Sequence, residues 1–399
     1  MSEKLAIEGG TPIREKFLPF ALASIGDEEI GEVVDTLKSG WLTAGPKTKA
    51  FEEAFAAFTG APYAVAVNSC TAALHLCLMG FRIGTGDEVI TTPLTFAATA
   101  NTIMMTGAKP VFVDVDEASY NIDPALIEKA ITKHTKAIIP VHIGGLPANM
   151  TEILRVAERY GLHVIEDAAH AAGARYNGTP VGNLSDATCF SFYVTKTITT
   201  GEGGMITTAS RELADRVRML SLHGLSRDAW NRYSSKGSWY YEIVDLGYKY
   251  NMNDIQAALG LQQLKKIEQF TRRRRDIARR YDEALRSMPA ITLPPRDTPQ
   301  AEHIYHLYTV RLSLGRLSIT RDRFIEALRA ENIGTSVHFI PVHLHPYYRK
   351  EFGLERGAFP VAEKIFDSII SVPIYPAMTE GDVADVIAAV EKIIRSVTA

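Results

Sequence analysis

A regular alternation of short apolar runs with helix-like stretches, between about residue 60 and residue 208, constrains the fold of this 399-residue chain more than any other feature. The apolar runs have the length and continuous hydrophobicity of strands that are covered on both faces. Such alternation predicts an α/β layered fold around a mainly parallel sheet. The strand candidates are YAVAVNS (63–69), EVITTPLT (88–95), KPVFVDVD (109–116), KAIIPVHI (136–143), HVIEDAA (163–169), ATCFSFY (187–193) and GMITT (204–208).

The texture of the sequence changes after about residue 250. A long amphipathic stretch, NDIQAALGLQQLKKIEQFTRRRRDIARRYDEAL, predicts one or two long helices. The strand candidates HLYTVRL and SVHFIPV follow, with a helical stretch between them. We therefore expect two domains. A large α/β domain with the N-terminal segment would span residues 1–262, and a smaller α+β domain would span residues 263–399.

The charge balance and the cysteines exclude several classes of protein. A formal net charge of −3 and a pI of about 6.4 argue against nucleic acid or an anionic membrane as a partner. No apolar run approaches the roughly 20 residues of a membrane helix, and MSEKLAIEGG lacks the apolar core of a signal peptide. Cys70, Cys77 and Cys189 form no CxxC pair, so neither a zinc site nor a disulfide framework is indicated. We expect a cytoplasmic protein with reduced thiols.

Glycine motifs argue against two common types of α/β enzyme. The cluster GFRIGTGDEV (80–89) follows a helix and precedes a strand, which reverses the order of a dinucleotide-binding unit. The chain also has no Walker A motif. Neither nicotinamide nor P-loop chemistry is therefore expected.

Charged side chains follow two of the predicted strands. Glu166 and Asp167 end one strand, His170 lies just beyond them, and Lys196 follows another strand. Ligands of parallel sheets bind at such strand ends, where a carboxylate is costly unless it meets a cation. A lysine in a dry pocket has a lowered pKa and can attack a carbonyl. Alone, Asp167 is as readily a helix cap and Lys196 a surface lysine. Together they are the groups that pyridoxal 5′-phosphate (PLP) requires.

A phosphate cradle is also present in the pattern. In NSCTAALHL (68–76) a strand ends and small residues, Cys70 and Thr71 among them, open a helix whose N–H groups can hold an anion. Ser191, in the strand before Lys196, is a second donor, and Phe96 is placed to stack on an aromatic ring. Each has a plain alternative, because Ser and Thr are ordinary helix caps and Phe96 can be a core residue.

Several motifs in order resemble the DegT/StrS-type sugar-nucleotide aminotransferases, from about residue 18 to residue 394. These are PLP enzymes of the aspartate-aminotransferase fold (fold type I), with a mainly parallel sheet in a large domain and a smaller C-terminal domain. The motifs are SGWLTAGP, NSCTAALHL, DEVITTPLTFAATAN, AIIPVHIGG, VIEDAAHAAGA, FSFYVTKTITTGEGGMI, GYKYNMNDIQAALGLQQL and SVHFIPVHLHPYYR. GYKYN, RDAWNR and KAIIPVH resemble the branch that aminates C4 of a UDP-linked 4-keto sugar, as in UDP-4-amino-4-deoxy-L-arabinose formation.

The resemblance implies roles for individual residues. Lys196 would form the Schiff base with PLP and shuttle the proton, Asp167 would bind the pyridine nitrogen, and His170 would support the ring. The remaining cofactor contacts would be Cys70, Thr71 and Ser191 at the phosphate and Phe96 against the ring. Many relatives have glycine where this chain has Cys70, whose N–H can still reach the phosphate.

The resemblance also implies a homodimer in which each subunit completes the other's site. Asn251 of GYKYN would reach the phosphate of the other subunit. Because the commoner family pattern is GYNYR, either Lys249 or Asn251 can hold that role, and we favour Asn251.

Substrate contacts are expected in three segments. The candidates are Trp41 and Thr43 for the sugar pocket, Arg227 and Trp230 for the nucleotide, and His338 and His345 in a loop that the resemblance indicates as a substrate loop. The loop HFIPVHLHPYYR places His343 between the last two, and alternate histidines are also typical of metal sites. No cysteine or carboxylate lies beside them, so we expect a substrate loop and no metal.

The predicted reaction transfers an amino group from L-glutamate to a 4-keto sugar nucleotide and releases 2-oxoglutarate. The product would enter lipopolysaccharide or another polysaccharide, a glycoprotein glycan or an antibiotic. A C3-specific aminotransferase is the alternative within this class. A PLP sugar dehydratase is disfavoured because those relatives replace the lysine with histidine. A non-catalytic regulatory protein is disfavoured because Lys196, Asp167 and His170 are all present.

Overall fold

The apolar runs predicted between residues 63 and 208 form one central sheet. In the computed structural model, which describes residues 4–226 and 240–398, this sheet has seven strands in the order β1-β9-β8-β5-β4-β2-β3. Every predicted run contributes one strand, which confirms that prediction. The strands are β1 (Tyr63–Val67), β2 (Glu88–Thr91), β3 (Lys109–Phe112), β4 (Thr135–Ile138), β5 (His163–Asp167), β8 (Ala187–Ser191) and β9 (Gly204–Thr208).

Strand direction brings the polar strand ends together. β2 pairs in parallel with β3 and β4, β4 with β5, and β5 with β8. β9 is antiparallel to both β1 and β8, so it alone runs against the other described strands of this sheet. The carboxyl ends of the others therefore lie along one edge, where α/β proteins place their ligands.

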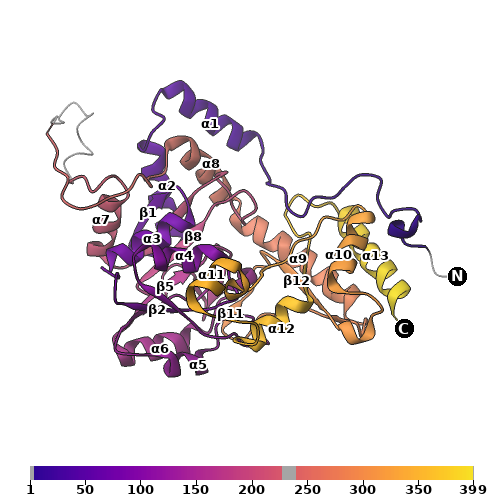
Figure 1. Ribbon diagram of the computed structural model, residues 1–399. Coiled ribbons are helices and arrows are strands. Elements are labelled where there is room, and N and C mark those ends of the chain that lie inside the picture. The colour runs from indigo at the N-terminus through magenta and orange to yellow at the C-terminus, as the bar shows by residue number, and fades with distance from the viewer. Residues whose placement is uncertain (1–3, 227–239, 399) are drawn as a thin grey trace.

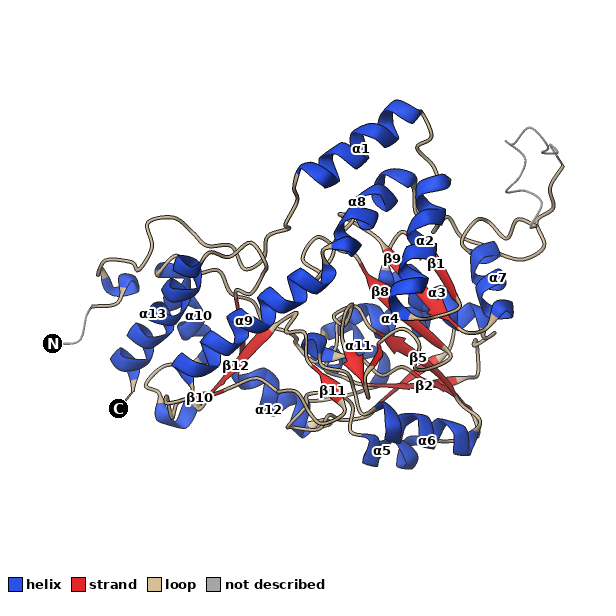
Figure 2. Cartoon of the chain, turned by 180° about the vertical axis from the view of Figure 1, so that it is seen from behind, coloured by secondary structure: helices blue, strands red, loops and turns tan. Residues whose placement is uncertain are grey.

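Helices cover both faces of the sheet, as Figure 2 shows. Because successive side chains of a strand point to opposite faces, Val65 and Val67 pack with α3 and α7, while Ala64 and Ala66 face the cluster that contains α2 and α8. Near β4 and β5, helices α5 and α6 pack in a further cluster. The helices of this part are α1 (Asp27–Ser39), α2 (Pro46–Thr59), α3 (Cys70–Gly80), α4 (Ala97–Met105), α5 (Pro124–Ala130), α6 (Met150–Tyr160), α7 (Arg211–Leu220) and α8 (Asp254–Lys265).

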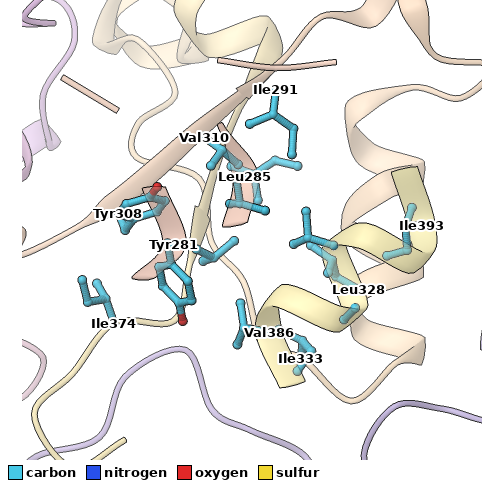
Figure 3. Packing of buried hydrophobic residues seen from close by; sticks show 14 of the residues in the cluster. Tyr281, Leu285, Ile291, Tyr308, Val310, Leu328, Ile333, Ile374, Val386 and Ile393 are labelled. Atoms are coloured by element: carbon cyan, nitrogen blue, oxygen red, sulfur yellow. The ribbon is translucent and has the colours of Figure 1, made fainter. Parts of the chain in front are cut away.

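The C-terminal part has its own antiparallel sheet in the order β10-β12-β13 and its own core, seen in Figure 3. The long amphipathic stretch forms two helices, and α9 runs from the large part into this core: Phe270 packs in the former, and Tyr281 and Leu285 in the latter. The elements are α9 (Ile267–Leu285), β10 (Ile291–Thr292), β12 (Tyr308–Leu312), α10 (Arg321–Ala330), α11 (Pro346–Phe352), α12 (Pro360–Ser368), β13 (Ile369–Val372) and α13 (Glu380–Val397). A separate small sheet contains β6 (Arg175–Tyr176), β7 (Thr179–Pro180) and β11 (Ala301–Glu302).

The N-terminal segment crosses between the two parts. Leu5 and Leu18 are buried in the C-terminal core, and the buried carboxylate of Glu331 accepts hydrogen bonds from the N–H groups of Ala6 and Ile13, both 2.9 Å. Figure 1 shows the first described residues of this segment at the end of the molecule that holds α10 and α13. The division into residues 1–262 and 263–399 stays a proposal, and α8 spans its boundary.

One strand prediction in the C-terminal part is wrong. SVHFIPV forms no strand among the described residues and keeps only an isolated bridge between Ser336 and Ser371. The segment then leaves the sheet and lines a cavity with His338 and Phe339, and Pro341 has no N–H to give to a ladder. Within the described residues no helix is long and apolar enough to cross a membrane.

Candidate active site

The carboxyl ends of β1, β2, β5 and β8 open into a cavity of about 520 Å³. Asp167 is the last residue of β5 and Ser191 the last of β8, and the chain reaches the cavity directly after β1 and β2. The N-terminal segment adds Phe20, and the C-terminal part adds His306 and His338. The N-terminal segment, the strand ends of the large part and the C-terminal part therefore all line the same cavity.

Lys196 lies on the cavity wall in the loop between β8 and β9. Its N–H donates to the carbonyl of Tyr193 at 2.9 Å. Farther along the loop, Gln256 of α8 donates to the carbonyl of Glu202 at 2.8 Å. Burial lowers the pKa of Lys196 to about 8, although nearby Cys70 and Asp167 act in the opposite direction. The loop thus presents an amine that is partly neutral near physiological pH.

This pKa sets the pH dependence of cofactor capture. With a pKa of about 8, about a tenth of the Lys196 amine is neutral at pH 7 and about half at pH 8. The rate constant for capture of PLP by the cofactor-free protein should rise with pH and level off above about pH 9, measured as growth of the yellow absorbance band. Nα-acetyl-lysine amide, as the control, should keep gaining rate through pH 10. A protein profile that follows the control contradicts the lowered pKa.

Asp167 carries a buried carboxylate that lines the same cavity. Burial raises its pKa, while the Thr99 hydroxyl, the N–H of Ala169 and the nearby Lys196 oppose that rise. Thr99 donates to Oδ2 at 2.8 Å and the N–H of Ala169 to Oδ1 at 3.2 Å. These bonds fix the carboxylate, and a cationic ligand group is the partner that would repay its burial.

Thr99→Val tests the support of Asp167. Valine keeps the shape of the buried side chain and removes the hydrogen bond to Oδ2. Hydrogen bonds to charged groups contribute about 1.5–3 kcal/mol. We therefore expect kcat/KM for the predicted amino transfer to fall by about 10-fold to 100-fold. Thr102→Val is the matched control, since that buried hydroxyl donates only to the carbonyl of Thr99. Equal activities of the two variants would contradict the assigned role.

The turn after β1 forms an anion cradle. Ser69 caps α3 by accepting from the N–H of Ala72 at 3.1 Å. No described residue accepts from the N–H groups of Cys70 and Thr71, which therefore remain for a ligand at the positive end of the helix. Gly204, which opens β9, lies against this turn: a Cβ there would be 2.5 Å from the carbonyl carbon of Ser69 and 2.7 Å from the nitrogen of Cys70. Close backbone approach thus explains the glycine at position 204, where the glycine-rich turn enters β9.

Gly204→Ala should damage this cradle. The added carbon meets backbone atoms, which cannot move without shifting α3. We expect a loss of about 1–3 kcal/mol in the free energy of unfolding, measured with urea, and at least about tenfold weaker PLP binding. Gly315→Ala is the control, because a Cβ at Gly315 meets nothing within 4 Å. Wild-type PLP affinity in Gly204→Ala would overturn the close-approach argument.

Three imidazoles line the cavity near Lys196. His170 accepts from the N–H of Gly144 at 3.3 Å through Nδ1, so Nε2 carries the proton of the neutral ring. Burial and the nearby Lys196 hold the pKa of His170 well below its usual range. His338 lies 2.8 Å from the Ser371 hydroxyl, and burial lowers its pKa to about 3. His306 packs against His170, with ring centroids 4.6 Å apart. At pH 7 the mostly protonated amine of Lys196 therefore lies near three neutral imidazole rings.

The structure brings most of the predicted site residues together. Those that line the cavity are Cys70, Thr71, Phe96, Asp167, His170, Ser191, Lys196 and His338. Phe96 is 64% exposed, which leaves its ring free to contact a ligand or a partner.

Other predicted residues lie elsewhere or outside the described chain. Trp41 and Thr43 lie between α1 and α2, His345 is the N-cap residue just before α11, and Asn251 accepts from the Lys249 amine; none of them lines this cavity. The predicted contacts Arg227 and Trp230 lie outside the described residues.

The loop histidines serve different neighbours. His338 reaches the cavity, whereas His343 is 2.9 Å from the Glu363 carboxylate. Among residues 4–226 and 240–398, no group of three or more histidine, cysteine or acidic side chains is arranged to hold a metal ion.

Sequence reasoning missed Thr99 and His306. Thr99 lies one helical turn beyond Phe96, so its spacing carried a weak signal. His306 precedes β12, far from the other site residues in the chain, and no pattern in its own segment marks it.

Known proteins are similar to this chain over nearly its whole length. A sequence profile of the DegT/DnrJ/EryC1/StrS aminotransferase family matches residues 23–391. The spore coat polysaccharide biosynthesis protein SpsC of Bacillus subtilis is 55% identical over 383 residues, which cover 96% of this chain and 98% of SpsC. The uncharacterized protein MJ1066 of Methanocaldococcus jannaschii is 56% identical over 382 residues, which cover 96% and 99%.

Solved structures show the same fold. Spr1654 of Streptococcus pneumoniae, assigned as a sugar aminotransferase and solved in its PLP form, is 35% identical with a TM-score of 0.89 and coverage of 95% of this chain and 99% of that one. PseC of Helicobacter pylori, an aminotransferase of pseudoaminic acid biosynthesis, is 29% identical with a TM-score of 0.88 and coverage of 96% and 100%. The α/β fold is therefore that of the PLP-dependent aminotransferases.

Proposed function

This chain belongs to the DegT/DnrJ/EryC1/StrS aminotransferase family. On that premise we propose that it transfers an amino group from L-glutamate to a 4-keto sugar linked to a nucleotide, which is UDP in the branch it resembles. One observation carries the proposal: Lys196 and Asp167 face one cavity beside a helix N-terminus with free N–H groups. The amine, the carboxylate and the anion cradle match the three chemically distinct ends of PLP.

The residues present fit the cofactor of this family. Asp167 would meet the pyridine nitrogen, the N–H groups of Cys70 and Thr71 with Ser191 would meet the phosphate, and Phe96 would lie against the ring. The buried carboxylate of Asp167 and the space that Gly204 leaves at the cradle both support this assignment. When bound, PLP supplies the carbonyl that carries the amine and a ring that takes up electrons.

The chain's own groups hold and move the proton. The amine of Lys196, with a pKa of about 8, can take a proton from the reacting carbon and return it near neutral pH. Asp167 keeps a negative charge opposite the ring nitrogen, which Thr99 helps to fix. The neutral His170 places no second positive charge beside the lysine, and it packs at the cavity wall.

A sugar acceptor is supported by the relatives. SpsC is named for polysaccharide biosynthesis and PseC for pseudoaminic acid biosynthesis. The choice of C4 and of a UDP-linked sugar rests on the GYKYN and KAIIPVH segments. Amination at C3 is the alternative acceptor position.

The two half-reactions provide the test. L-glutamate should bleach the yellow band of the PLP-loaded protein, and 2-oxoglutarate should appear in equal amount. The bleached protein should then aminate a UDP-linked 4-keto sugar, detected by mass spectrometry, in preference to 3-keto sugars and to other nucleotides. A band that L-glutamate leaves unchanged would refute the donor. A preference for 3-keto sugars would replace the C4 assignment with C3.

Exposed apolar side chains support a homodimer. On α1, Ile30 and Leu37 are 55% and 51% exposed, and between α7 and α8 Ile243 and Leu246 are similarly uncovered. Patches of this kind mark interfaces. Asn251 lies outside the lining of its own cavity, which supports our proposal that it serves the cavity of a second copy.

Mixing two inactive variants tests the shared site. In a heterodimer of Lys196→Ala and Asn251→Ala, one of the two sites has both Lys196 and the second copy's Asn251 intact. Random re-assembly should therefore restore about a quarter of wild-type activity. The same experiment with Lys249→Ala decides between the two residues of GYKYN. A monomer by sedimentation, or no recovery with either variant, would contradict the proposal.

A further inference from the structure

His306 is held in the cavity by unusual local structure. It directly follows Tyr305, whose φ of 51° is in the left-handed region that non-glycine residues avoid. The N–H groups of Ile304 and Leu307 donate to the carbonyls of Gly145 and Gly144, at 3.2 and 3.1 Å. Strained backbone of this kind persists where its surroundings enforce it, and it clusters at functional sites.

A buried arginine completes the support. Arg274 of α9 donates to the carbonyl of His306 at 3.1 Å and to that of Ile374 at 2.6 Å, and both contacts are buried. No described carboxylate pairs with it, so a costly buried cation is used to hold this backbone. Contacts from both parts of the molecule, Gly144 and Gly145 in the large part and Arg274 in α9, therefore fix the position of His306.

The imidazole of His306 has no hydrogen-bond partner among the described residues. His306 is 5% exposed, and neither ring nitrogen makes a hydrogen bond to a described residue. Nδ1 is fully covered, whereas Nε2 retains accessible surface in a residue that lines the cavity. A buried polar group without a hydrogen-bond partner destabilises the fold. His170 and His338 differ, because each has one nitrogen bonded to the protein.

The charged side chains of the cavity indicate which ligand group would bind the His306 ring. Among the described lining residues, the charged side chains are Asp167, Glu202 and Lys196. An amino-acid donor brings an α-carboxylate next to the reacting carbon, and therefore near Lys196, which has to move the proton. Asp167 and Glu202 repel the donor's α-carboxylate, which therefore needs N–H groups in addition to Lys196 to bind it. His306 lines the same cavity as Lys196 and packs against the ring of His170, with ring centroids 4.6 Å apart.

From this placement we propose that His306 binds the α-carboxylate of the amino donor through Nε2 and so sets the affinity for the donor. The inference rests on the aminotransferase function proposed above and adds a residue to it. The keto sugar carries no such carboxylate at its reacting carbon, so His306 should matter in the donor half-reaction and little in the acceptor half-reaction.

Carboxylate binding should also change the protonation of the ring. The groups facing His306 are His170, Lys196, Arg274 and His338, and burial together with these groups holds its pKa well below the usual range. The His306 imidazole is therefore neutral near pH 7. An arriving carboxylate favours the charged form, so the ring should take up a proton as the donor carboxylate binds.

Calorimetry of the PLP-loaded protein measures both effects. 2-Oxoglutarate, which has the same carboxylates as L-glutamate but no amine, is titrated at pH 7.5 in two buffers of different ionisation heat. Wild-type protein should take up a proton on binding. His306→Phe, which keeps the ring packing, should bind about 30-fold more weakly without proton uptake, and His306→Asn about 3-fold to 10-fold more weakly, also without uptake.

The controls separate this role from a structural one. His75→Phe also removes a buried imidazole with an unpartnered nitrogen, outside the cavity, and should keep wild-type affinity and uptake. His306→Phe and His306→Asn should retain PLP stoichiometry and the wild-type rate of the acceptor half-reaction within about threefold. If one of them does not fold, the other still gives the affinity and the uptake.

Two results would overturn the inference while the proposed function stands. One is that His306→Phe binds 2-oxoglutarate with wild-type affinity or still takes up the proton. The other is that the His306 variants lose rate only in the acceptor half-reaction. Failure of L-glutamate to bleach wild-type protein would instead overturn the donor assignment itself, and the inference with it.

Discussion

Lys196→Ala is expected to reduce turnover at least about 10⁴-fold. The change removes the amine that faces the cavity and the base that moves the proton, and positioned acid–base groups alone contribute up to about 10⁴-fold. The variant should also fail to develop the yellow band with PLP. Turnover measured with L-glutamate and the keto sugar, together with the absorbance spectrum, checks both effects.

Two controls accompany this variant. Lys265→Ala removes an exposed lysine of α8 and should behave as wild type. An external primary amine added to Lys196→Ala should restore part of the activity, because the missing group is a base and the fold is intact. Retention of more than about a tenth of wild-type turnover would refute the role of Lys196.

Asp167→Asn is expected to lower kcat/KM by about 10³-fold. Asparagine has the same shape and can accept from Thr99, but it carries no charge to hold a proton on the ring nitrogen. PLP binding should persist at reduced affinity, since the phosphate cradle is unchanged. Stopped-flow measurement of bleaching by L-glutamate gives the effect on the donor half-reaction.

The control for this variant is Asp186→Asn, which removes a half-exposed carboxylate just before β8, away from the cavity. It should leave the bleaching rate within about twofold of wild type. The series should order as wild type, Thr99→Val and Asp167→Asn, because the first change removes one hydrogen bond to the carboxylate and the second removes its charge. A normal bleaching rate in Asp167→Asn would mean that the carboxylate has a structural role only.

Local patterns were sufficient for the main sheet and for the central pair of groups. Buried parallel strands are continuous apolar runs, and each run predicted between residues 63 and 208 forms a strand. Because carboxyl ends of parallel strands meet at one edge, residues that follow different strands become neighbours, which is how Asp167 and Lys196 came to be paired from sequence alone. The PLP cofactor and the aminotransferase family followed from those residues and their surrounding motifs.

Local patterns failed where contacts between distant segments decide the structure. SVHFIPV has the composition of a strand, yet its neighbours draw it over the cavity, and only Ser336 pairs with a strand. The expected division into two domains stays a proposal, and no local pattern indicated that Leu5 and Leu18 pack in the C-terminal core. The apolar content of a segment predicts that it is buried, but it does not predict which other segments of the chain it packs against.

The sequence by itself determined the layered α/β fold, the strand ends that carry Asp167 and Lys196, and the chemistry those groups allow, because strand periodicity and strand-end position are local properties. Only the tertiary structure decided that Thr99 fixes the carboxylate, that Gly204 makes room for the cradle, and that His306 enters the cavity. Those contacts join residues tens to hundreds of positions apart, and their distances are set by how helices and sheets pack, which no single segment encodes.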